Sequence, residues 1–151
     1  MTIDELLAIE EIRTVRYLYG HYLDSGEIEK MVALFTDDGV AEWPEHMGGH
    51  WNTKKQMFEN WSKVFNDRAR PFDRMHMWTN PYIRLTAPDM ADGRFYMVSM
   101  RPFEEDGSKV IGTLGVHDDI YKKVDGKWYM HRTRMDFLYP FRNYDGPRIP
   151  Y

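Results

Sequence analysis

Asp24 and His76 are the two side chains whose types and positions most suggest chemistry. Asp24 directly follows a helical pattern, where the negative end of the helix dipole disfavours a carboxylate by roughly a few tenths of a kcal/mol. His76 lies on an aromatic strand face, where burying a charged imidazole is costly. If the two are partners, the carboxylate fixes the imidazole tautomer and raises the basicity of the other ring nitrogen. The pair therefore predicts His76 as a general base oriented by Asp24, with a purely structural pair as the alternative.

The segment that carries His76, residues 72–85, alternates with period two. One face would carry Met75, Met77, Ile83 and Leu85, and the other His76, Trp78, Tyr82 and Arg84. Neither face resembles a solvated sheet surface, so we expect both to be covered. The first is typical of a packing surface, and the second suits the wall of a half-polar cavity.

Other kinds of active site find little support in the chain. There is no Cys, which excludes disulfides, thiol nucleophiles and thiolate metal sites. The serines lack a G-x-S-x-G setting, and no glycine-rich phosphate loop or dinucleotide fingerprint occurs. His46 and His50 lie close together in a glycine-containing loop without a clear third ligand, so no metal site is predicted. General acid–base chemistry without a cofactor remains.

The composition favours a small hydrophobic or aromatic ligand. Aromatic residues make up 15% of the chain and there are 11 Met, enough to line a cavity, although an ordinary bulky core would look the same. The formal net charge is −4 and Lys and Arg are scattered, which argues against nucleic acid as a partner. The N-terminal residues lack a signal-peptide pattern, and no segment is long and apolar enough to span a membrane. We expect a cytoplasmic protein.

The elements that would position these residues follow from hydrophobic periodicity. The pattern predicts a first helix over about residues 3–23, a second after Ser25 that buries Phe35, a short strand over 40–43, and a third helix opening at Thr53. After the third helix, the hydrophobic pattern has a period of two residues. Asp-Gly turns at 92–93, 106–107 and 125–126 would separate strands over about 73–86, 93–103, 109–123 and 127–138.

This order predicts one α+β domain over residues 1–151, with three N-terminal helices packed in the concave face of a curved antiparallel sheet. Such a cone would open between the helix ends and the sheet. The tail, residues 140–151, is too aromatic for a typical disordered end. We expect it to cover the pocket mouth or a neighbouring subunit.

Three segments carry a resemblance to a known family: YLDSGEIEKMVALFTDDG, HMWTNPYIRL and HDDIYKKVDGKWYMHR. Together with the order of elements, they resemble the SnoaL-like branch of the nuclear transport factor 2-like superfamily, over nearly the whole chain. Its lyases, scytalone dehydratase and bile acid dehydratase among them, are cofactor-free enzymes on an α+β cone. The resemblance implies that fold. The same cone also hosts isomerases, hydrolases, non-catalytic subunits and binding modules.

The resemblance also assigns residues to roles. Asp24 and His76 match an aspartate and a catalytic histidine that these lyases share. Tyr19 matches a helix tyrosine of the site, and His117 matches a polar pocket position. Substrate contacts are expected from Tyr22, Trp43, Trp78, Ser99 and Met135. Leu23 stands where scytalone dehydratase has a site tyrosine, which implies a different substrate.

The leading hypothesis is a cofactor-independent lyase, most plainly a dehydratase of an aromatic or polycyclic alcohol. His76 would remove a proton beside a leaving hydroxyl, and Tyr19 or His117 would assist its departure. Loss of a small aldehyde from an aryl-substituted alcohol would use the same base. The other interpretations are a non-catalytic oligomerising subunit, similar to the small subunit of ring-hydroxylating dioxygenases, and a small-molecule binding module. The apolar face of residues 72–85 predicts association, with a homotrimer first and a dimer second.

Overall fold

The first helix begins where the sequence predicts. In the computed structural model, which describes residues 1–66, 71–101 and 111–149, α1 (Ile3–Ser25) starts at a capping box. The Thr2 hydroxyl accepts the backbone N–H of Glu5, whose carboxylate accepts the backbone N–H of Thr2. The helix ends at Gly26, which has a left-handed φ of 81° and leaves no room for a side chain beside the Phe65 ring.

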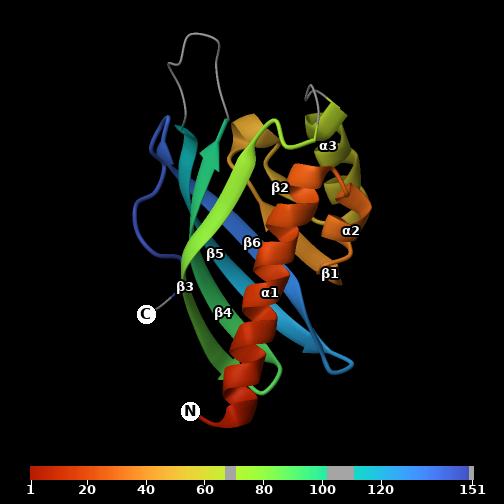
Figure 1. Cartoon of the computed structure of the whole chain (residues 1–151), viewed down its shortest axis with the longest axis vertical. Coiled ribbons are helices and arrows are strands. Elements are labelled where there is room, and N and C mark those ends of the chain that lie inside the picture. Colours follow the sequence, from red (N-terminus) through yellow and green to blue (C-terminus); the bar gives the residue numbers. More distant parts are fainter. Residues whose placement is uncertain (67–70, 102–110, 150–151) are drawn as a thin grey trace.

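The remaining elements follow in chain order. They are α2 (Ile28–Val32), β1 (Phe35–Glu42), the 3-10 helix η1 (Glu45–Met47), β2 (His50–Trp51), α3 (Lys54–Asn66), β3 (Met75–Ala87), β4 (Met90–Met100), β5 (Ile111–Val124) and β6 (Lys127–Tyr139). The strands form one sheet in the order β2-β1-β6-β5-β4-β3. Figure 1 shows α1 crossing one face of this sheet, with α2 and α3 gathered beside β1 and β2. The predicted α+β class with three helices against a curved sheet is confirmed.

The sheet is mixed, because β1 runs parallel to β6 while the other described pairings are antiparallel. The sequence had suggested that Phe35 belongs to the second helix, but Phe35 lies in β1. Four-residue spacing from Met31 fits a helix face, but α2 ends at Val32 and the Leu34 carbonyl accepts the Met130 backbone N–H of β6. Phe35 is buried in either arrangement, so periodicity alone did not decide between them.

One of the predicted Asp-Gly turns is present and one is not. Asp125 and Gly126 connect β5 to β6 with φ values of 49° and 80°, as a tight hairpin requires. Asp92-Gly93 lies inside β4, and the β3–β4 turn falls at residues 88–89 instead. Gly93 is needed there because a Cβ would come within 2.8 Å of the Tyr121 ring. The turn predicted at 106–107 lies outside the described residues.

A bulge in β3 reverses the faces that the sequence predicted for its second half. The register with β4 shifts between Thr79 and Tyr82, and Asn80 has a φ of 51°. His76 and Trp78 therefore share the inner face with Ile83 and Leu85, which pack against the core. Met75 and Met77 point outward and are 56% and 37% exposed. The prediction that all four apolar residues share one face was wrong, because the bulge interrupts period two.

The tail packs in part along the outer face of the sheet. The Arg94 guanidinium donates to the Ile149 carbonyl at 2.7 Å, and the Arg148 backbone N–H donates to Asp118 at 2.6 Å. Phe141, at the start of the tail, is 40% exposed. The last two residues of the tail, 150–151, lie outside the described residues. A covering role for the tail stays a prediction.

Candidate active site

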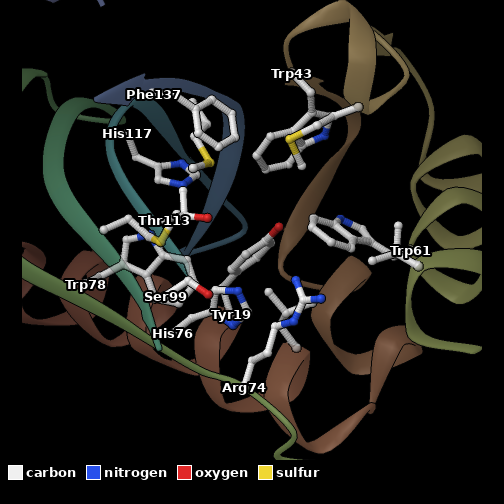
Figure 2. A pocket seen from close by; sticks show the side chains of 15 residues that line it. Tyr19, Trp43, Trp61, Arg74, His76, Trp78, Ser99, Thr113, His117 and Phe137 are labelled. Carbon is white, nitrogen blue, oxygen red and sulfur yellow. The ribbon is translucent and has the colours of Figure 1, made fainter. Parts of the chain in front are cut away.

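A cavity of about 110 Å³ opens between α1, α3 and the inner face of the sheet. Figure 2 shows the side chains that line it, which are mostly aromatic or apolar with a few polar groups among them. An apolar cavity of roughly 150 Å³ can hold one benzene ring. The cavity is smaller than that, so it holds at most a single ring, and any larger part of a ligand must reach toward the mouth.

Asp24 and His76 are joined by two hydrogen bonds. Asp24 Oδ1 lies 2.5 Å from Nδ1 of the imidazole, and Oδ2 accepts the His76 backbone N–H at 2.8 Å. The side chains are only 8% and 12% exposed, so the pair is largely shielded from water. These bonds also account for a carboxylate in the last turn of α1, where the helix dipole opposes it.

The hydrogen bond to Asp24 assigns the tautomer of His76. An ionised carboxylate only accepts, so Nδ1 must carry a hydrogen, and in the neutral imidazole Nε2 then has a lone pair. His76 lines the cavity, and its ring stacks on Trp78 with centroids 5.9 Å apart. The arrangement is a buried carboxylate, an oriented imidazole and a basic nitrogen in an apolar pocket, which is the set needed for proton abstraction.

A second imidazole, that of His117, lies in the wall of the same cavity (Figure 2). Its Nδ1 is 3.1 Å from the Thr133 hydroxyl, which in turn donates to Asp119 at 2.7 Å. Burial, with smaller contributions from Arg16 and His76, holds the pKa of His117 well below its usual value of 6.5. His117 is therefore neutral at physiological pH.

Three tryptophans from separate elements pack together beside the cavity, and two of them, Trp43 and Trp61, line it. Trp43 follows β1, Trp51 belongs to β2 and Trp61 to α3, and their ring centroids lie 5.5 to 5.6 Å apart in pairs. Trp43 also meets the edge of His117 at 5.9 Å. Tyr19 packs edge-on against Trp61 from the opposite side, with centroids 6.5 Å apart. The aromatic side chains thus hold the cavity open between helices and sheet.

Most of the predicted site residues meet at the cavity. Those that line it are Tyr19, His76, His117, Trp43, Trp78, Ser99 and Met135. Asp24 lies behind His76 and acts on it directly. Tyr22 is not among the cavity-lining residues that the structure describes. It packs against the hydrophobic core, and Lys30 Nζ lies 5.8 Å from the centroid of its ring. Whether these residues are functional stays a prediction.

Several residues of the wall were not predicted from the sequence. They are Met47, Trp61, Val64, Arg74, Met97, Thr113 and Phe137. One had a signal in the sequence: Arg74 has the same period-two parity as His76. Thr113 pairs with Ser99 across β4 and β5, a register that only the structure shows. The others come from η1, α3 and strand faces that meet only in three dimensions, so no local pattern marked them.

A metal site finds no support among residues 1–66, 71–101 and 111–149, where no cluster of three or more His, Cys, Asp or Glu could hold an ion. His46 lies against the Phe141 ring, with centroids 4.7 Å apart, and His50 is exposed in β2. No helix in this part of the chain is long and apolar enough to cross a membrane.

A family model described as a SnoaL-like domain matches residues 4–134, and the chain belongs to this family. The fold is that of NTF2-like proteins: an NTF2-like protein with a cystatin-like fold from Novosphingobium aromaticivorans superposes with a TM-score of 0.72 at 19% identity, over 91% of this chain and 86% of that one.

Two further structures from the same organism are similar. One is provisionally named a scytalone dehydratase and has a TM-score of 0.78 at 19% identity, covering 91% of this chain and 89% of that one. The other is the beta subunit of a provisionally named aromatic-ring-hydroxylating dioxygenase, with a TM-score of 0.72 at 16% identity, covering 89% and 91%. At these identities the similarity establishes the fold alone.

Proposed function

We propose that this protein is a cofactor-independent lyase that removes water from a small aromatic alcohol, with His76 as general base. The observation that carries the proposal is the Asp24–His76 pair, joined at 2.5 Å, with the imidazole in the wall of an aromatic cavity. A general base of this kind contributes roughly 10² to 10⁴ in rate. The cavity volume favours a one-ring alcohol over a polycyclic one.

The reaction needs only groups that the chain supplies. Nε2 of His76 takes a proton from the carbon next to the one that bears the hydroxyl. The electron pair of that C–H bond forms a double bond as the C–O bond breaks. The departing oxygen receives a proton from the imidazolium, with a hydrogen bond from the Tyr19 hydroxyl, so one alcohol gives one alkene and one water. Tyr19 also lines the cavity, and its ring centroid lies 5.6 Å from that of Trp78, on which His76 stacks.

The similarity to the protein provisionally named a scytalone dehydratase supports this reaction class but not a substrate. Loss of a small aldehyde from an aryl-substituted alcohol would use the same base on a hydroxyl proton. A non-catalytic subunit, such as the dioxygenase beta subunit, is the second candidate, favoured by apolar side chains on the outer face of β3. A subunit of that kind has no need of a base inside a cavity, so we favour the lyase.

The test is a two-stage screen. Aromatic alcohols are first ranked by their effect on the melting temperature of the native protein, and those that stabilise it are then incubated and examined by mass spectrometry for loss of water or of an aldehyde. We expect at least one stabilising alcohol to be converted. His76→Ala should abolish the conversion, whereas His21→Ala, at an exposed position of α1, should not. Conversion by neither the native protein nor any variant would favour the subunit or binding-module alternatives.

A further inference from the structure

We infer that His117 is a neutral hydrogen-bond acceptor whose tautomer is imposed by a buried chain of side chains, and that the cavity consequently selects aromatic ligands with a free hydroxyl group. The inference deepens the proposed function, because it specifies a chemical group that the substrate of that site must carry. It starts from a network beneath the cavity that the proposed reaction leaves unused.

The network ends in a buried ion pair. Arg16 and Asp119 have fully buried side chains, and the guanidinium Nε lies 3.5 Å from Asp119 Oδ2. Arg16 is always charged, and its guanidinium lies over the ring of Trp78 at 4.8 Å. A buried cation of this kind requires a buried anion, so Asp119 is ionised although desolvation raises its pKa.

An ionised Asp119 fixes the direction of each hydrogen bond toward it. A carboxylate can only accept, so the Tyr121 hydroxyl donates to Oδ2 at 2.8 Å and the Thr133 hydroxyl donates to Oδ1 at 2.7 Å. A threonine hydroxyl has a single hydrogen. Because that hydrogen is directed at Asp119, Thr133 can only accept from His117, whose Nδ1 is 3.1 Å away.

His117 therefore carries its hydrogen on Nδ1, and its Nε2 has a lone pair. The ring lines the cavity and makes T-shaped contacts with the rings of Trp43 and Trp78, at centroid distances of 5.9 and 5.8 Å. In this state Nε2 can accept a hydrogen bond but has no proton to give. The sequence had suggested that His117 could protonate a leaving hydroxyl, but in this state it cannot. His76 or Tyr19 must supply that proton.

The ligand must satisfy this acceptor. A buried acceptor that loses water without gaining a donor costs binding free energy, so a ligand with an O–H directed at Nε2 is favoured over one that lacks it. Aromatic walls surround the position, so the donor belongs on a ring or next to one. Thr133 and Asp119 are positioning residues in this scheme, since they act on the ligand only through the tautomer of His117.

The first experiment reads the tautomer directly, without a ligand. Long-range proton–nitrogen correlation spectra of the labelled native protein should show His117 protonated on Nδ1 only. Thr133→Val, which keeps the shape but removes the acceptor, should weaken or reverse that preference, and Thr133→Ser, which keeps the hydroxyl, should restore it. A native His117 that is protonated on Nε2, or on both nitrogens near pH 7, would overturn the inference.

The second experiment measures selection with two probes of nearly the same shape, 4-methylphenol and para-xylene, in which a methyl group replaces the hydroxyl. By calorimetry or ligand-observed NMR, the phenol should bind the native protein about tenfold more tightly. His117→Phe should reduce the preference to less than about twofold, while His21→Ala, at an exposed position of α1, should retain it. Equal binding of the two probes, or a preference that survives His117→Phe, would contradict the inference.

The two proposals fail in different ways. If no alcohol is ever converted but the phenol preference and the tautomer hold, the lyase proposal fails and the acceptor role of His117 stands. If an alcohol is converted while His117→Phe leaves the phenol preference intact, the acceptor role of His117 fails and the lyase proposal stands.

Discussion

Asp24 binds His76 through both the backbone and the ring, with Oδ2 on the backbone N–H at 2.8 Å and Oδ1 on Nδ1 at 2.5 Å. One carboxylate at the end of α1 thus positions the start of β3 and fixes the orientation of the imidazole ring. The Asp24 carbonyl adds a bond from the Phe72 backbone N–H at 2.8 Å. The helix end and the strand start are therefore a single unit, and the orientation of His76 depends on their alignment.

Replacing Asp24 by Asn should change the tautomer of His76 while leaving the fold intact. The amide can still accept the His76 backbone N–H through its oxygen, but its NH₂ group then faces Nδ1 and favours the Nε2–H tautomer. Nitrogen chemical shifts of His76 in native and variant protein would report this directly. An unchanged shift pattern in the folded variant would mean that the Asp24 carboxylate does not set the tautomer of His76.

Gly20 gives a test of the wall formed by Trp78. A Cβ at Gly20 would lie within 2.9 Å of Cε3 of the indole, because the helix packs directly on that ring. Gly20→Ala should therefore destabilise the protein by about 1–3 kcal/mol, despite the better helix propensity of Ala, and weaken ligand binding as Trp78 moves into the cavity. Urea unfolding measures the first effect. Thr14→Ala, exposed on the same helix, is the control and should stay within about 0.5 kcal/mol of the native value.

The buried state of His117 predicts a loss of stability in mild acid. Burial, Arg16 and His76 lower its pKa in the folded protein, and Asp119 is the nearest carboxylate, at 3.9 Å from Nδ1. The unfolded chain takes up a proton near pH 6.5 and the folded chain does not, so the free energy of unfolding falls as the pH drops below that value. The slope approaches about 1.4 kcal/mol per pH unit for one such group.

Urea unfolding at about pH 7.5 and about pH 5.5, within the range where histidine titrates, should show this loss in the native protein. In His117→Phe the loss should be smaller by the contribution of one proton. Identical pH dependence in the two proteins would show that His117 ionises normally or does not contribute.

We propose that the outer face of β3 and β4 mediates self-association. Met75, Met77 and Tyr96 are 56%, 37% and 48% exposed, and the register places them on one surface. Sedimentation should show a homotrimer, or failing that a dimer, at micromolar concentration. Met77→Lys should weaken association, while Leu6→Lys, 50% exposed on α1, should not. A monomer of 18.1 kDa for the native protein would contradict the proposal.

Local signals in the sequence were sufficient for much of the fold. The capping box at Thr2, the change from helical to two-residue periodicity, and the turn at Asp125-Gly126 each depend on neighbouring residues, and each is confirmed. The effect of the bulge at Asn80 on the faces of β3 was not predicted. A single left-handed residue moves every later side chain to the other face of the strand, and it does so without changing the pattern of residue types.

In the candidate site too, some residues could be predicted from local features of the sequence and others could not. His76 and Asp24 could be paired from their unfavourable local settings, and the structure brings them together across 52 positions of sequence. The network of Arg16, Asp119 and Thr133 could not be predicted, because α1, β5 and β6 meet only in the folded sheet and each residue alone is unremarkable. Parity along β3 could have indicated Arg74, two residues before His76.

Single-turnover rates of His76→Ala, Asp24→Asn and the double variant, on the alcohol identified by the screen, test the central claim most directly. Each single variant should be slower by at least about a hundredfold. The double variant should be far less impaired than the product of the two effects, because residues that act as one unit are not additive. Rates close to that of the native protein in His76→Ala, with lost stability as the main effect of both changes, would contradict the account.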